Sequence, residues 1–152
     1  MGNSAATHDK ELEMLTKGIE AVDKGDTSTG LRCLEGLFET RLDPFVTSYY
    51  AVCLAKERGE VEKAIFLCRE ASEEDPGNPV HYLNLGRVLL AGGRKKEAIK
   101  AFRDGLLYGK NQLIKKELDM LGWRKPPVIS WLGREHPLNR SLGRIFHQLG
   151  LR

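Results

Sequence analysis

Apolar residues recur at every third or fourth position along much of the chain, which is the spacing of one face of an α-helix. Between residues 79 and 110, Tyr82, Leu85 and Leu89 follow this spacing ahead of a glycine pair at 92–93. Two later stretches do the same, with Leu113, Ile114, Leu118 and Leu121 in one and Leu138, Leu142, Ile145, Phe146 and Leu149 in the other. The pattern predicts an all-α fold.

Glycines interrupt the helical pattern at a fixed interval. Gly25, Gly59 and Gly93 are 34 residues apart, and so are Ala64 and Ala98. Prolines at 44 and 76 mark where the second helices of the first two units stop. A turn that recurs at this interval is typical of stacked helical hairpins, in which each unit covers the apolar face of its neighbour.

The third unit, residues 79–110, resembles the tetratricopeptide repeat family. The family places an aromatic residue, a Leu-Gly pair and another large residue on the first helix, where this chain has Tyr82, Leu85, Gly86 and Leu89. Ala98 and Phe102 stand at the small and aromatic positions of the second helix. Gly86 and Ala98 must be small because the two helices cross closely there.

The other two units follow the family pattern less closely. In residues 45–78, Ser48, Ala51 and Val52 replace the aromatic residue and the Leu-Gly pair, so a looser crossing is expected at Val52. In residues 9–44, Gly30 and Leu34 stand where Ala and an aromatic residue are usual, as suits a degenerate terminal unit. The resemblance implies a right-handed superhelical stack of three helix-turn-helix units with C-terminal capping helices.

The expected organisation is a single domain. Residues 1–8 are predicted to be a flexible N-terminal tail. Residues 9–44, 45–78 and 79–110 are the three repeats, of which the first is degenerate. Residues 111–152 are predicted to form a capping helix with Asn111 as its N-cap, a Pro-rich loop, and a C-terminal helix that starts near Pro137 and ends near Gly150.

The resemblance also implies a function, because the first helices of such repeats line a concave groove that binds a peptide or helix of another protein. Carried over residue by residue, the groove positions are Leu12, Leu15, Ile19 and Val22 in the first repeat, Val46, Tyr49, Tyr50, Cys53 and Lys56 in the second, and Val80, Leu83, Asn84, Arg87 and Leu90 in the third. Asn84 is expected to pair with a peptide backbone and Arg87 with a carboxylate. Replacing both by Ala is then expected to weaken binding and to leave unfolding nearly unchanged.

The sequence leaves open what covers this apolar groove. An external protein, the predicted C-terminal helix or another protomer would each do so. Trp123 and Trp131 flank the Pro-rich loop, and they are either interface anchors for a partner or pins that hold the tail on the third repeat.

Charge divides the chain, although its net charge is only +3. Residues 1–86 carry nine Lys/Arg and sixteen Asp/Glu, a net charge of −7, while residues 87–152 carry fifteen and five, a net charge of +10. One alternative is therefore that the basic half docks on nucleic acid or an anionic membrane through Arg94, Lys95, Lys96, Lys115, Lys116, Arg124, Lys125, Arg140 and Arg144. Another is self-association, in which acidic and basic ends of two protomers meet.

Catalysis has little support in these 152 residues. The chain lacks a Gly-rich phosphate loop, a His-Glu-x-x-His motif and a Gly-x-Ser-x-Gly motif, so no catalytic residue, metal or cofactor is expected. Cys33, Cys53 and Cys68 fall within helical apolar patterns and are expected to be small buried side chains. With no long apolar run and no signal-peptide pattern at the start, we expect a cytoplasmic protein.

Overall fold

The computed structural model of the chain describes residues 3–40, 43–122 and 137–148. The described elements are all helices, which confirms the predicted fold class: α1 (Asn3–Lys24), α2 (Thr27–Thr40), α3 (Pro44–Glu57), α4 (Val61–Glu74), α5 (Pro79–Ala91), α6 (Lys95–Tyr108), α7 (Gln112–Met120) and α8 (Pro137–Gln148). Helices α1 to α7 belong to one compact unit, Met1–Met120, and α8 belongs to a second, Leu121–Arg152.

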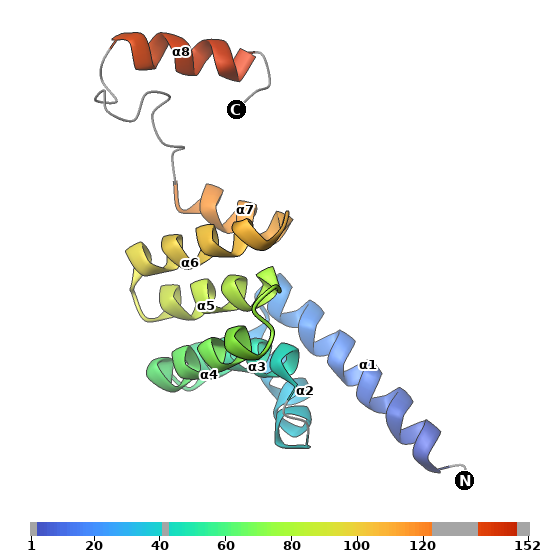
Figure 1. Cartoon of the computed structure of the whole chain (residues 1–152). Helices are drawn as coiled ribbons and strands as arrows, with labels where there is room; N and C mark the ends of the chain where they lie inside the picture. The colour runs from blue at the N-terminus through green and yellow to red at the C-terminus, as the bar shows by residue number, and fades with distance from the viewer. Residues whose placement is uncertain (1–2, 41–42, 123–136, 149–152) are drawn as a thin grey trace. The chain divides into compact units, whose positions relative to one another are not determined.

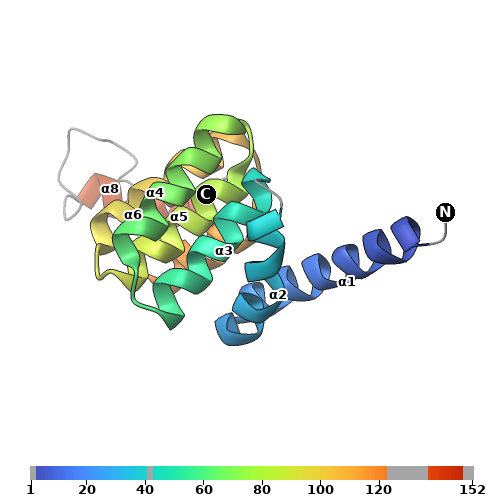
Figure 2. The ribbon, with the colours of Figure 1, turned by 90° about the horizontal axis from the view of Figure 1, so that it is seen from below.

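The first unit is a stack of three helical hairpins, α1 with α2, α3 with α4, and α5 with α6 (Figure 1). Helix α3 packs against both α2 and α5, α4 packs against α5, and α7 packs on α6. Helix α1 is eight residues longer than α2, and its N-terminal half projects from the stack in both views (Figures 1 and 2). In this half, the side chains of residues 8–10, Leu12 and Glu13 are exposed.

The three glycines at the interval of 34 form the turns of the three hairpins. Gly25, Gly59 and Gly93 have backbone φ angles of +91°, +70° and +73°, in the left-handed region that side chains with a Cβ disfavour. What recurs every 34 residues is therefore a turn with a positive φ angle. This requirement explains why all three repeats have glycine at the turn, although the first two differ from the family pattern at other positions.

Three side chains cap the first turns of helices in the stack, and of these only the cap at Asn111 was predicted. The side chain of Asp43 accepts hydrogen bonds from the first amides of α3, that of Asn78 does so for α5, and Asn111 caps α7. Helix α1 begins at Asn3 and not at position 9, so most of the expected N-terminal tail is helical. The alanines in this stretch favour that extension because alanine has the highest helix propensity. The repeat boundaries stay predictions.

The two helices of the third hairpin cross closely, as predicted. A Cβ atom at Gly86 would collide with the ring of Phe102, and Phe102 is completely buried. The same device occurs two periods earlier, where a Cβ at Gly18 would lie 2.8 Å from Leu34 Cδ2. Gly18 lies two periods before Gly86, but it was not among the predicted close crossings. In both hairpins, a glycine on the first helix leaves the space that a large side chain of the second helix occupies.

The second hairpin reaches the same packing with different residues. At the equivalent positions it has Val52 and Cys68, which are 1% and 0% exposed. A larger residue on the first helix is matched by a smaller one on the second, so the volume at the crossing is conserved. Both residues at this crossing are buried, and the looser crossing expected at Val52 stays a prediction.

Candidate partner-binding face

Arg87 ties three helices together on the side of the stack formed by α1, α3, α5 and α7. It projects from α5, its side chain is 7% exposed, and its guanidinium donates hydrogen bonds to two carboxylates. Nη1 lies 2.7 Å from Asp23 Oδ1 at the end of α1, and Nε lies 3.0 Å from Glu117 Oε1 on α7. Charge-assisted bonds of this kind are stronger than neutral ones and become stronger still when water is excluded.

Asn84 lies beside Arg87 and is completely buried. Its amide nitrogen donates to Ser48 Oγ at 3.2 Å, and its carbonyl oxygen accepts from Arg87 Nη1 at 3.4 Å. The donor and the acceptor that we expected to meet a peptide backbone are thus used within the fold. Replacing Asn84 or Arg87 by Ala would leave buried polar groups without partners, so the expectation that unfolding stays unchanged does not fit this geometry.

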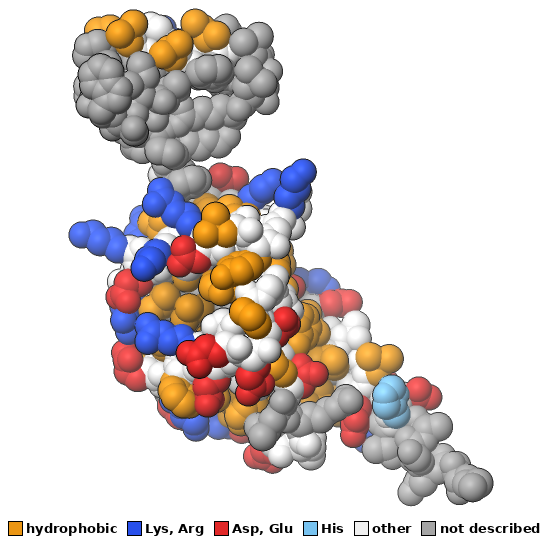
Figure 3. Space-filling model, in the orientation of Figure 1, with side chains coloured by type: hydrophobic (Ala, Val, Ile, Leu, Met, Phe, Trp, Pro, Cys, Tyr) orange, Lys and Arg blue, Asp and Glu red, His pale blue; other side chains and the backbone are white. Residues whose placement is uncertain are grey.

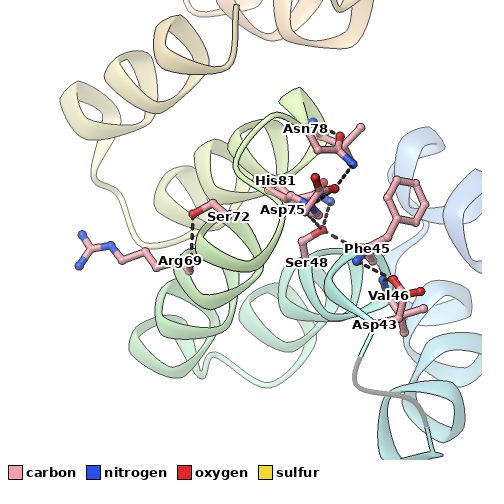
Figure 4. A network of polar contacts seen from close by, with 11 residues as sticks. Asp43, Phe45, Val46, Ser48, Arg69, Ser72, Asp75, Asn78 and His81 are labelled. Atoms are coloured by element: carbon pink, nitrogen blue, oxygen red, sulfur yellow. Dashed lines mark hydrogen bonds and ion pairs between the residues drawn. The ribbon is translucent and has the colours of Figure 1, made fainter. Parts of the chain in front are cut away.

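A second polar chain runs from Ser48 to the loop after α4 (Figure 4). His81 is completely buried, with Nδ1 3.1 Å from Ser48 Oγ and Nε2 3.3 Å from Asp75 Oδ2. Burial lowers the pKa of His81 below its usual 6.5, although Asp75 opposes that shift. Hydrogen bonds from Asn78 and His81 lower the pKa of the Asp75 carboxyl. His81 is therefore a structural link between α3 and α5.

The two tyrosines predicted for the groove also pack inward. Tyr49 is 3% exposed and its hydroxyl donates to Asp23 Oδ2 at 3.3 Å. Burial first, and then the negative charge of Asp23, raise the pKa of this hydroxyl well above its usual range. The ring of Tyr50 stacks on that of Phe38 of α2 with centroids 4.4 Å apart. Both residues join the second hairpin to the first.

The most exposed apolar residue of the predicted set, Leu12, lies on α1. Leu12 is 55% exposed, and Leu15 and Ile19 are half-buried on the same side of the helix. A recess follows this row where α1 meets the next two helices, lined by His8, Glu11, Leu12, Leu15, Leu37 and Val46. Apolar atoms are visible along α1 in the space-filling view (Figure 3). We call Leu12, Leu15 and Ile19 the α1 row.

The remaining predicted positions divide by burial. Cys53 and Leu83 are completely buried and Val22 and Val46 nearly so, Val80 and Leu90 are half-buried, and Lys56 is exposed. Trp123 and Trp131 lie outside the described residues. Groove binding by any of these residues stays a prediction.

Sequence reasoning missed the three residues that hold the polar side chains in place, namely Asp23, Ser48 and Glu117. Asp23 follows Ile19 by one helical turn, so it continues the α1 row as a charged end. A buried-face arginine on a repeat helix is itself a signal, because a buried guanidinium requires carboxylates nearby. Looking for acidic residues at the ends of neighbouring helices would have found Asp23.

The cysteines are buried, as predicted. Burial raises the pKa of the Cys53 thiol to about 12, and it also raises that of Cys68. Both thiols are therefore protonated near neutral pH, and a protonated thiol is a poor nucleophile.

The hairpins and their shared interior define an all-α helical repeat protein. The family model described as tetratricopeptide repeat matches residues 55–116, and this part of the chain is a tetratricopeptide repeat domain. No curated protein matches the chain. Among the described residues, no helix is both long and apolar enough to cross a bilayer.

One solved structure of similar fold is described as "Structure of Naa15/Naa10 bound to HypK-THB". The match has a TM-score of 0.60 and 22% identity, and it covers 73% of this chain but only 17% of the other. This likeness supports the fold. The repeat family is generally non-catalytic and points to a protein-protein interaction scaffold.

Proposed function

We propose that the protein is a non-enzymatic adaptor that binds a peptide or an amphipathic helix of another protein along its first helices. The exposed half of α1 is the principal contact. The observation that carries the proposal is the α1 row, in which Leu12 is 55% exposed beside the half-buried Leu15 and Ile19. Apolar side chains spaced by three and four residues on a projecting helix suit the anchors of a second helix.

The charges around the row indicate the chemistry of the partner. Asp9, Glu13 and Glu20, together with Lys17, line the hollow that borders Leu12 on α1. The three carboxylates give this border a net negative charge, so a partner with basic residues beside its apolar anchors would bind best. The buried Asn84 and Arg87 contribute indirectly, because Arg87 holds the end of α1 against α5 and α7.

The predicted groove continues from this row to Lys56, Val80 and Leu90, which are the other positions with accessible side chains. A short partner helix would contact α1 alone, whereas an extended peptide would reach the third hairpin. The similar solved structure, a complex of Naa15 and Naa10 with HypK-THB, supports a protein partner only as a class.

The test is affinity capture from the native cell with three forms of the full chain. Leu12→Asp alters the α1 row, and Phe66→Asp is the matched control, because Phe66 is a 59% exposed apolar residue on α4 and receives the same new charge. A partner of the α1 row is retained by the wild type and by the control and is lost with Leu12→Asp. Equal retention by all three forms would show that the partner binds elsewhere.

A second pair of variants tests the charge. Glu13→Lys with Glu20→Lys reverses the acidic border, and Glu73→Lys with Glu74→Lys makes the same change on the exposed end of α4. The first pair is expected to weaken binding of the captured partner about tenfold or more, and the second to change it little. Circular dichroism of each variant checks that the helices remain folded.

A further inference from the structure

Helix α8 carries a one-sided apolar surface. Leu138, Leu142 and Ile145 are separated by four and three residues, so they share one face of the helix. Leu138 is 55% exposed and Ile145 is 48% exposed, while Leu142 is half-buried. The apolar side chains of α8 are seen at the surface in Figure 3.

The same helix carries only positive charge. Pro137–Gln148 contains two arginines and no acidic residue, and Arg144, about 100° around the helix from its neighbour Ile145, is exposed. Residues 121–152 as a whole contain six Lys/Arg and one Glu, a net charge of +5. Basic residues both precede and follow α8 in the sequence, and residues 121–152 also contain two tryptophans.

We propose that α8 docks in the plane of an anionic lipid bilayer, with the apolar face of Leu138, Leu142 and Ile145 among the acyl chains and the basic residues at the phospholipid headgroups. A helix with aliphatic residues on one face and arginines on the other has the composition that binds at a membrane interface. Each Lys or Arg near an anionic surface adds to the attraction.

The combination of features favours lipid over nucleic acid. A nucleic acid would neutralise the arginines and leave Leu138 and Ile145 in water, whereas a bilayer receives both faces of the helix. A planar anionic surface also neutralises basic residues spread along the whole segment, which a narrow acidic groove on a protein does not. The inference concerns α8 alone and does not depend on partner binding at α1.

The experiment is flotation of the full chain with phosphatidylcholine vesicles that contain or lack phosphatidylserine. Wild-type protein is expected to float with the phosphatidylserine vesicles at low salt, to be released as salt rises, and to bind phosphatidylcholine alone at least about tenfold more weakly. Absence of binding, or equal binding to both kinds of vesicle, overturns the proposal.

Two substitutions in α8 have matched controls in the first unit. Ile145→Asp and Arg144→Glu are each expected to weaken vesicle binding about tenfold. Leu107→Asp is the control for the first, because Leu107 is an 82% exposed leucine of α6, and Lys100→Glu is the control for the second. Both controls are expected to bind vesicles as the wild type does. Loss of binding in the controls as well would mean that general charge attraction, and not α8, holds the protein on lipid.

Two further outcomes assign α8 to another partner. Sedimentation without vesicles, at two protein concentrations, detects self-association, and its loss in Ile145→Asp would show that α8 binds a second copy of the chain. Binding to DNA or RNA that Arg144→Glu weakens and Ile145→Asp does not would assign the basic face to nucleic acid. Either result, in a protein that does not float with vesicles, overturns the lipid proposal.

Discussion

The first and third hairpins have equivalent positions with different exposure. Ile19 and Arg87 are two periods apart, and so are Leu15 and Leu83. In the third hairpin both residues are buried, whereas in the first both are only half-buried. The repeat position alone therefore does not decide whether a side chain meets a partner.

The difference follows from the neighbours of each helix. Helix α5 packs against α3, α4 and α6, and its Arg87 also reaches α1 and α7. Helix α1 packs mainly against α2 and, less extensively, against α3. The first hairpin has no further helix packed on its outer side and keeps its groove positions available, whereas the third, which also contacts α7, uses them to hold the stack together.

The largest effect is expected at Arg87. Arg87→Ala removes the cation between Asp23 and Glu117 and should lower the free energy of unfolding by about 3 kcal/mol. Arg94→Ala is the control, because Arg94 pairs with Glu97 and Glu62 at the surface, where solvent screens the charges and such pairs contribute little to stability. Urea denaturation measures both. If both variants lost the same free energy of unfolding, buried Arg87 would contribute no more to stability than surface Arg94, contrary to this prediction.

The close crossings give the next largest effect. Gly86→Ala places a methyl group against the ring of Phe102 and should cost about 2 kcal/mol, whereas Gly18→Ala, against the more adaptable Leu34, should cost about 1 kcal/mol. Gly36→Ala on α2 meets no atom within 4 Å and should stabilise by about 0.5–1 kcal/mol. Thermal unfolding of the three variants tests this order, and destabilisation by Gly36→Ala would refute the packing argument.

Tyr49 provides a smaller effect. Tyr49→Phe removes the hydroxyl that donates to Asp23 and should cost about 1 kcal/mol. Leu12→Ala on the projecting half of α1 should change stability by less than about 0.5 kcal/mol, because the side chain is already 55% exposed. If Leu12→Ala were as costly as Tyr49→Phe, the α1 row would be part of the core.

The smallest effect near neutral pH is expected at His81. Because burial lowers the pKa of His81 in the folded state below 6.5, the unfolded chain binds more protons between the two pKa values. Stability from this residue is therefore present above about pH 6.5 and is lost as the pH falls below it. Asp75, whose pKa is also lowered, loses its contribution in the same direction at more acidic pH.

His81→Gln is expected to flatten the dependence of unfolding on pH across this window. His8→Gln on α1 is the control, because His8 is exposed, and it should keep the wild-type slope. An unchanged slope in His81→Gln would show that the buried ring does not link stability to pH.

The sequence was sufficient for the fold where backbone geometry leaves little choice. Turns such as Gly59 need a positive φ, and a cap such as Asn111 needs a side-chain acceptor, so their residue types identify them. Packing at Val52 could not be predicted from one position, because its match is a smaller residue 16 positions later, Cys68. Residues from both helices fill the space at a crossing, and a motif on one helix does not specify the residue that faces it on the other.

The candidate site was predictable only in its apolar half. Leu12, Leu15 and Ile19 came from the family's groove positions; Leu12 is exposed and the other two are half-buried, and their binding to a partner stays a prediction. The roles of Asn84 and Arg87 depended on Asp23 and Glu117, which come from helices more than 25 residues away in sequence. Burial of a polar residue depends on those distant partners, which the repeat pattern does not specify.

The most direct test of the central claim is a double-mutant cycle between Asp23 and Arg87, with unfolding free energies measured for Asp23→Ala, Arg87→Ala and the double variant. The two residues are predicted to stabilise each other by about 1–3 kcal/mol. A coupling near zero, with Arg87→Ala as stable as the wild type, would contradict that prediction and return Arg87 to the set of groove residues that await a partner.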